Sequence, residues 1–255
     1  MSIEPAGDAD GRPSATRIIA GDVMDGVASL TVGDDRAVGN TFQSANGFYI
    51  LATPTDGHLR TNENSGIWFR RAVDQLEPDP RCLYVPELPE GWLYEGFVDI
   101  EGQPVTSGKF RDPWAIDMSA PYNGPIDRNE TDMFDVMFDE YVSVVVQGEN
   151  GRELITGDAG WKLFQKEGPD LDLFFHGPPE PGEDYLVNPP PGLEFPVDLA
   201  GAPIYVTIEP DPDDSPEPFA LQPLAGTVPV NAVSHHTYIL NPDWKNFPTG
   251  TATLN

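Results

Sequence analysis

The stretch Ala202–Glu209, which reads APIYVTIE, shows the alternation of side chains that decides the fold class. Its apolar residues Ile204, Val206 and Ile208 are spaced two apart, and the residues between them carry hydroxyl groups. A period of two residues places the apolar side chains on one face of a β-strand. A turn rich in proline and aspartate follows at 210–214, and a second apolar run comes after it. This part of the chain therefore predicts an antiparallel hairpin with a long loop.

The longest alternating stretch is Thr131–Gln147. The apolar residues at its even positions are Phe134, Val136, Phe138, Val142, Val144 and Val146. Glu140 interrupts this face, and a β-bulge or bend that turns its carboxylate to solvent is the simplest explanation. This stretch, too, has the periodicity of a strand and not that of a helix.

Short apolar runs between turn residues recur along the whole chain, which contains 28 prolines and 25 glycines. Proline ends helices and interrupts central strands, so this composition favours short strands joined by ordered loops. The predicted strands lie near Arg17–Ala20, Gly26–Val32, Gly47–Ala52, Gly66–Ala72, Cys82–Val85, Trp92–Ile100, Pro113–Met118, Met133–Gln147, Glu153–Thr156, Trp161–Gln165, Leu171–Phe175, Leu193–Val197, Ala202–Glu209, Phe219–Leu224, Thr227–Val233, Thr237–Leu240 and Thr249–Leu254. The best helix candidates are Asp34–Ser44 and Ala72–Leu76.

These elements predict an all-β chain, namely an antiparallel β-sandwich of jelly-roll type with long ordered loops. Strands do not alternate with helices, which argues against a parallel α/β sheet. Residues 1–16 are mostly polar or small and have no periodicity, so we predict an extended N-terminal arm there. The sandwich takes up residues 17–255. The sequence leaves open whether this part also contains a second small β-domain or large inserted loops.

The chain is strongly acidic, with 42 Asp and Glu against 14 Lys and Arg and a formal net charge of -28. The acidic residues are spread along the sequence and do not form one tail, so we interpret them as an adaptation to concentrated salt. Repulsion between them opposes a compact fold in dilute buffer, whereas at molar salt the screening length falls to about 3 Å. Nucleic acids and anionic membranes are unfavourable partners for such a surface.

The N-terminal sequence MSIEPAGDADGRPSA contains neither the basic nor the apolar segment of a secretion signal, so we predict synthesis in the cytoplasm. The longest apolar stretch, near Val142–Val146, is too short to cross a membrane, and we predict no direct membrane insertion. Cys82 is the single cysteine and lies in an apolar run, where we expect it to be buried.

No motif of a catalytic site occurs in the chain, so we predict that it is not an enzyme and needs no cofactor. His235 and His236 are adjacent, and neighbouring side chains of a strand point to opposite faces, so they would not bind one metal together. Asp211, Asp213 and Asp214 form an acidic loop whose oxygens suit a hard cation such as Ca²⁺, but the EF-hand pattern is absent. We predict a solvated acidic turn there and no metal site.

The tryptophans are the remaining candidates for binding. Each of the five lies within two residues of a glycine or proline: Trp68, Trp92, Trp114, Trp161 and Trp244. Aromatic side chains near loops can serve as platforms for sugars or as anchors for proteins. Packing in the core and under loops is the simpler prediction for most of them.

An all-β, proline-rich, acidic chain with an extended arm and no active-site motif resembles the jelly-roll capsid proteins of icosahedral, internal-membrane haloarchaeal viruses. The resemblance covers the general character of the whole chain. It implies an upright jelly roll in a pseudo-hexameric capsomer, with loops that contact neighbours and an arm that ties subunits together. The partners would be copies of this chain and other virion proteins, in an oligomer within the virion. The protein could equally be a turret, spike or tail component.

Two other functions stay open at this point. A non-catalytic carbohydrate- or ligand-binding sandwich predicts a groove lined by two or more of the tryptophans. A cupin-like metal enzyme predicts His235 or His236 beside His58 or His176 and a carboxylate.

Overall fold

The computed structural model describes residues 1–53 except 5, 6, 8 and 10, together with 62–69, 83–113, 118, 121–122, 181–254 except 187 and 214, and the backbone of 142–148, 151–156 and 172–175. Within these residues, helical structure is limited to the 3-10 turns Glu63–Ser65 and Trp244–Asn246. All paired strands are antiparallel. The prediction of an all-β antiparallel fold is confirmed.

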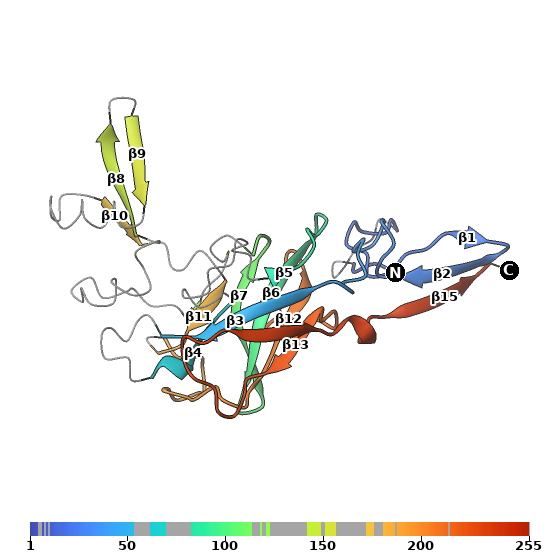
Figure 1. Cartoon of the computed structure of the whole chain (residues 1–255). Helices are drawn as coiled ribbons and strands as arrows, with labels where there is room; N and C mark the ends of the chain where they lie inside the picture. Colours follow the sequence, from blue (N-terminus) through green and yellow to red (C-terminus); the bar gives the residue numbers. More distant parts are fainter. Residues whose placement is uncertain are drawn as a thin grey trace.

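The largest sheet curls into a nearly closed, barrel-like sandwich (Figure 1). Its strands follow the order β11-β4-β3-β14-β13-β12-β6-β7, and β5 pairs with β3. Their bounds are β3 Asn46–Leu51, β4 Gly66–Trp68, β5 Leu83–Tyr84, β6 Trp92–Ile100, β7 Gln103–Phe110, β11 Gly182–Asp184, β12 Pro203–Pro210, β13 Leu224–Thr227 and β14 Tyr238–Pro242. The two ends of this order meet where the Tyr185 hydroxyl, just after β11, donates to the Thr106 carbonyl oxygen of β7 at 3.2 Å.

Half of the strand pairings in the described residues join strands that are consecutive in the sequence. β6 and β7 form a hairpin, and β12, β13 and β14 form a meander that returns to β3. A jelly roll contains Greek keys, in which four strands have the spatial order 4-1-2-3. Among the described strands, β6, β7, β11 and β12 have this order, β12-β6-β7-β11, where β11 contacts β7. The described strands confirm the antiparallel sandwich, in a nearly closed, barrel-like form.

The interior of the barrel is apolar and aromatic. The stretch Ala202–Glu209 turns its apolar face to this interior, as its alternation predicts. Ile204, Val206 and Ile208 of β12 are fully buried, and they pack in one cluster with Tyr94 and Val98 of β6. β12 and β6 pair over their length, from Ile204 opposite Val98 to Pro210 opposite Trp92. Most residues of both strands are buried.

A second sheet joins the two ends of the chain and extends away from the barrel (Figure 1). It contains β1 (Val23–Met24), β2 (Val27–Thr31) and β15 (Thr249–Thr253), in the order β1-β2-β15. Asp25 and Gly26 link β1 to β2 with φ angles of 51° and 80°, the left-handed pair of a type I′ hairpin turn. We call residues 23–31 and 249–253 the terminal ribbon.

The predicted extended N-terminal arm folds back on itself in its described residues. The Ile3 N–H donates to the Thr16 carbonyl oxygen at 2.9 Å, and the Ile18 N–H donates to the Met1 carbonyl oxygen at 3.0 Å. These antiparallel bonds place the first residues beside 16–18, at the base of the terminal ribbon. The two ends of the segment, residues 1–3 and 16–18, therefore lie side by side.

The structure adds three strands that the pattern missed: β1, β7 and β11. β1 is only two residues long, and glycine and polar residues break the alternation of β7 and β11. Leu193–Val197 forms no strand, and most of Phe219–Leu224 and Thr227–Val233 lies outside β13. Residues 34–44 form turns in place of the candidate helix. No helix among the described residues is long and apolar enough to cross a membrane.

A third sheet contains β8 (Val142–Gly148), β9 (Gly151–Thr156) and β10 (Asp172–Phe175), in the order β10-β8-β9. It confirms strands at the end of the long alternating stretch and in the predicted runs Glu153–Thr156 and Leu171–Phe175. Several predicted features lie outside the described residues: residues 131–140 with Glu140, Ala72–Leu76, Trp161–Gln165, Cys82 and most of Pro113–Met118.

Candidate functional site

The terminal ribbon has one face without any cover among the described residues. Residues directly opposite each other in antiparallel strands point to the same face. In the ribbon, Met24 pairs with Val27, and Val27, Ser29 and Thr31 pair with Thr253, Thr251 and Thr249. All of these residues are exposed, and none of them carries a charge.

The opposite face of the ribbon packs against the start of the chain. Ala28 is 3% exposed and Ile19 is 6% exposed. A Cβ added to Gly250 would lie 3.3 Å from the Ile19 Cδ1 atom, so the ribbon and residue 19 are in close contact there. This packing fixes the ribbon on one side and leaves the threonine-rich face open.

The outer edge of β15 presents backbone groups with a defined spacing. Hydrogen-bonded and non-hydrogen-bonded pairs alternate along an antiparallel ladder. The Leu254 N–H donates to the Gly26 carbonyl oxygen at 2.8 Å, which makes Ala252–Ala28 and Gly250–Leu30 the next bonded pairs. The N–H and C=O groups of Thr249, Thr251 and Thr253 therefore point away from β2. Within the described part of the chain, β15 pairs with β2 alone.

An exposed edge strand is a template for another strand, and proteins usually protect it with charges, prolines or bulges. The sequence of β15, TGTAT, contains none of these, and threonine favours extended structure. The only charged residue of the whole terminal ribbon is Asp25, at its turn. In a chain of net charge -28, β15 is thus an uncharged edge suited to the addition of a strand.

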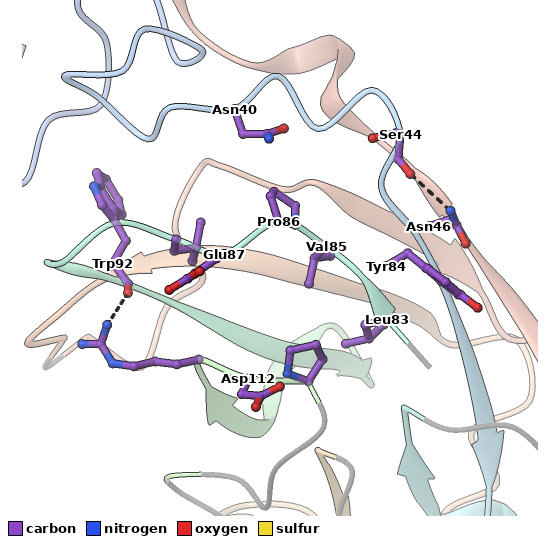
Figure 2. A pocket seen from close by; sticks show the side chains of 13 residues that line it. Asn40, Ser44, Asn46, Leu83, Tyr84, Val85, Pro86, Glu87, Trp92 and Asp112 are labelled. Carbon is purple, nitrogen blue, oxygen red and sulfur yellow. Dashed lines mark hydrogen bonds between the residues drawn. The ribbon is translucent and has the colours of Figure 1, made fainter. Parts of the chain in front are cut away.

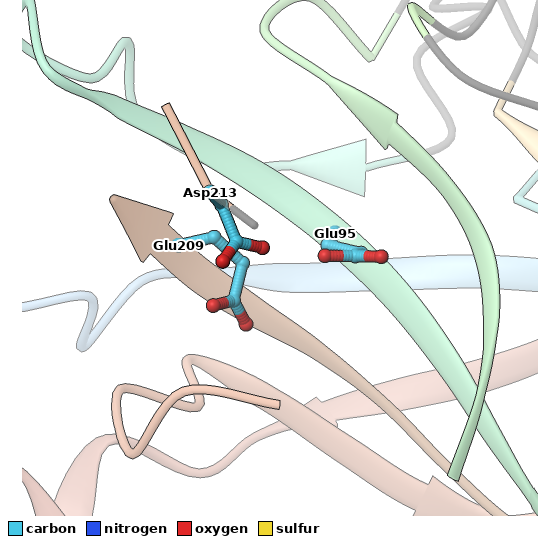
Figure 3. A group of neighbouring side chains, drawn as sticks. All are labelled: Glu95, Glu209 and Asp213. Carbon is cyan, nitrogen blue, oxygen red and sulfur yellow. The ribbon is translucent and has the colours of Figure 1, made fainter. Parts of the chain in front are cut away.

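A second notable group of side chains lies on the outer side of the barrel wall (Figure 3). Glu95 of β6, Glu209 of β12 and Asp213 of the following loop hold carboxylate oxygens within 4.8 Å of one another. Lys109 of β7 stands opposite Glu95, and its ammonium group is 2.8 Å from Asp213 Oδ2 and 3.7 Å from Glu95 Oε2. We call these four residues the carboxylate cluster.

Burial is the main influence on the carboxylate cluster. It raises the pKa of Glu95 to about 7, against the opposing effects of a hydrogen bond from Thr106 and the charge of Lys109. Burial also raises the pKa of Glu209, although this carboxylate accepts hydrogen bonds from the Thr207 hydroxyl and the Phe219 N–H. Among the described residues, Glu95 Oε2 has no hydrogen-bond partner.

The carboxylate cluster ties the loop after β12 to the barrel wall. Its three acids exceed its one base, so protons or a further cation must balance it when the site is buried. Carboxylate oxygens at this spacing are the ligands of a hard cation such as Ca²⁺, and the Lys109 ammonium group lies among them. The geometry gives the cluster a structural role: Lys109 bridges Asp213 and Glu95, and Glu209 fixes the Phe219 N–H.

The sequence identified one of the four residues of the cluster. Of the acidic loop 211–214, Asp213 joins the carboxylate cluster, Asp211 forms an ion pair with Arg111, and Asp214 lies outside the described residues. The sequence did not predict Glu95 and Glu209 as site residues. Each occupies an outward position of an alternating strand, where a solvated carboxylate is expected.

The two histidines lie in a turn, in contrast to the strand that was predicted for them. His235 has a φ of 58°, and its Nε2 is 2.7 Å from Glu63 Oε2. The ring of His236 packs edge-on against Tyr238 with centroids 5.0 Å apart. The two side chains therefore have separate partners. His58 and His176 lie outside the described residues.

The tryptophans that the structure describes mainly fill the interior. Trp92 is fully buried and Trp68 is 3% exposed, whereas Trp244 is partly buried against the core. Trp114 and Trp161 lie outside the described residues. An open pocket of about 760 Å³ is lined by Tyr84, Glu87, Trp92, Asp112 and neighbouring residues (Figure 2). Trp92 is the one tryptophan among the described residues that line this pocket.

Comparisons with known proteins add no identity. No protein family matches this chain, and neither a curated protein nor a solved structure is significantly similar to it.

Proposed function

We propose that this chain is a non-enzymatic structural subunit of a haloarchaeal virus particle and that it assembles through its terminal ribbon. The observation that carries the proposal is the ribbon itself: an uncharged, exposed face and an unprotected edge strand that extend from an otherwise acidic barrel. An isolated soluble domain would normally protect such an edge. The function of the terminal ribbon is then to contact other chains, either copies of this chain or other virion proteins.

The charge of the chain supports a salt-dependent assembly. Subunits of net charge -28 repel one another in dilute buffer, and molar salt screens this repulsion over about 3 Å. The terminal ribbon then offers the least repulsive approach between subunits. The spread of acidic residues and the scarcity of lysine support the halophilic host.

The proposal is tested by adding charge to the edge of β15. We expect the double variant Thr251→Asp, Thr253→Asp to lose the assembly that the wild type shows in molar salt, because like charges would face each other in the contact. The matched control is Val230→Asp, since Val230 is 86% exposed on the barrel. Light scattering after size-exclusion chromatography measures the assembly, and circular dichroism confirms the fold.

Electron microscopy of the wild-type assembly tests the viral part of the proposal. Closed shells or regular lattices would support a virion subunit. A wild type that stays monomeric at high concentration in molar salt, or a double variant that assembles as the wild type does, would contradict the proposed function.

A further inference from the structure

We infer that two copies of this chain join by antiparallel pairing of their β15 strands, centred on Thr251. This inference rests on the proposed assembly function and names its partner, its contact and its register. The result is a continuous sheet in the order β1-β2-β15-β15′-β2′-β1′, where primes mark the second copy.

The backbone fixes the register. Only Thr249, Thr251 and Thr253 direct their N–H and C=O groups to the outer edge, so these residues must face one another across the contact. With Thr251 opposite its own copy, Thr249 faces Thr253 of the partner, and all three outward residues of both strands are used. A shift by two residues in either direction leaves one end of β15 opposite residues outside the strand.

The side chains allow this register on both faces of the sheet. On the open face, each threonine lies opposite a threonine, and cross-strand pairs of this kind stabilise antiparallel sheets. On the other face, Gly250 lies opposite Ala252 of the partner, and neither side chain is large enough to obstruct the approach. No charged residue of β15 comes opposite another.

The symmetry of the contact favours a second copy as the partner. A twofold contact uses the same patch on both subunits, so the patch must complement itself. The sequence TGTAT reads as threonine, small residue, threonine, small residue, threonine in both directions. A parallel addition to the same edge, or pairing with a different protein, would not place Thr251 opposite itself.

Cysteine cross-linking tests the register. In a Cys82→Ser background, Thr251→Cys should form a disulfide-linked dimer under mild oxidation in molar salt, because opposite bonded residues have Cα atoms about 5.5 Å apart, within the range of a disulfide. Thr249→Cys alone should give no dimer, because its copies are about 14 Å apart in this register. A mixture of Thr249→Cys and Thr253→Cys chains should cross-link to each other. Non-reducing electrophoresis measures all three.

A second variant tests the backbone bonds without a new thiol. Thr251→Pro removes an N–H group that points outward, which an edge strand tolerates, so the monomer should fold and the dimer should be lost. Ala252→Pro is the matched control and should disturb the ribbon itself, because its N–H bonds to β2.

The outcomes separate this inference from the proposed function. Equal cross-linking of Thr251→Cys and Thr249→Cys, or none with Thr251→Cys while the wild type still assembles, overturns the register and leaves the assembly function standing. Loss of assembly in the charged double variant together with dimers in Thr251→Cys supports both. Monomeric wild type under all salt conditions overturns both.

Discussion

The barrel wall buries carboxylates, whereas the terminal ribbon exposes uncharged residues. Glu95 and Glu209 lie on paired central strands at 4% and 1% exposure, while Thr251 and Val27 of the ribbon are open to solvent. In the wall, hydrogen bonds and Lys109 hold the acids in place. In the ribbon, no described contact holds the exposed face. In a very acidic chain, an exposed surface without charge is therefore a better indication of a contact site than a cluster of acidic residues.

Salt should have the largest effect, because it acts both on the acidic barrel and on the contacts that we propose between subunits. We expect a reduction from molar NaCl to about 0.1 M, which lengthens the screening distance from about 3 to about 10 Å, to dissociate the assembly and destabilise the barrel. Light scattering and circular dichroism during dialysis measure the two effects. If both signals stay constant over this range, repulsion between acidic residues does not control assembly or stability.

Truncation of a side chain should cost much more stability in the barrel than in the terminal ribbon, because only the barrel side chain is buried. Ile208→Ala should lower the free energy of unfolding by about 2–5 kcal/mol, because Ile208 is fully buried in the barrel. Val27→Ala, on the open face of the ribbon, should change it by less than about 0.5 kcal/mol. Denaturant unfolding of the monomer in molar salt measures both. Similar losses in the two variants would mean that the ribbon face is covered in the monomer.

Glu95 should make the stability of the barrel depend on pH. Its pKa is raised to about 7 in the folded chain, so the folded state binds the proton more tightly than the unfolded state. The stabilisation is therefore complete below about pH 4.5 and is lost as the pH rises to about 7, by up to about 3 kcal/mol. Glu95→Gln should abolish this loss and be the more stable protein at pH 8.

The control for Glu95 is the same substitution at the exposed Glu101, in the turn between β6 and β7. Glu101→Gln should keep the pH dependence of the wild type in denaturant unfolding. Equal pH profiles of Glu95→Gln and the wild type would show that Glu95 is ionised in the folded chain without cost.

The smallest effect on stability should come from the one charge of the ribbon. Asp25→Asn keeps a residue that accepts the left-handed φ of the turn, so the stability of the monomer should change by less than about 0.5 kcal/mol. The salt concentration at the midpoint of assembly should fall, because the ribbon then carries no charge. An unchanged midpoint would place the assembly contact away from the turn.

The sequence predicted the all-β class and the positions of several strands, because alternation in stretches such as Ala202–Glu209 is a local signal. It missed β7, whose Gly108 and polar side chains break the period, and whose place depends on its partner β6. The N-terminal arm was predicted as extended since its pairing with residues 16–18 is a non-local contact.

The candidate sites were harder to predict than the strands. Asp213 was singled out among the loop acids, yet Glu95 and Glu209 looked like ordinary outward residues until the loop after β12 was seen to cover them. The sequence TGTAT shows directly that β15 carries no charge. That β15 is an edge strand follows only from its pairing with β2, which comes from the other end of the sequence.

That union of sequence ends has a consequence for the timing of synthesis. A ribosome produces β1 and β2 first and β15 last, after every strand of the barrel. In the assembly that we propose, the edge that accepts a partner forms only after β15 has been synthesised, so a chain that ends before β15 would lack this contact.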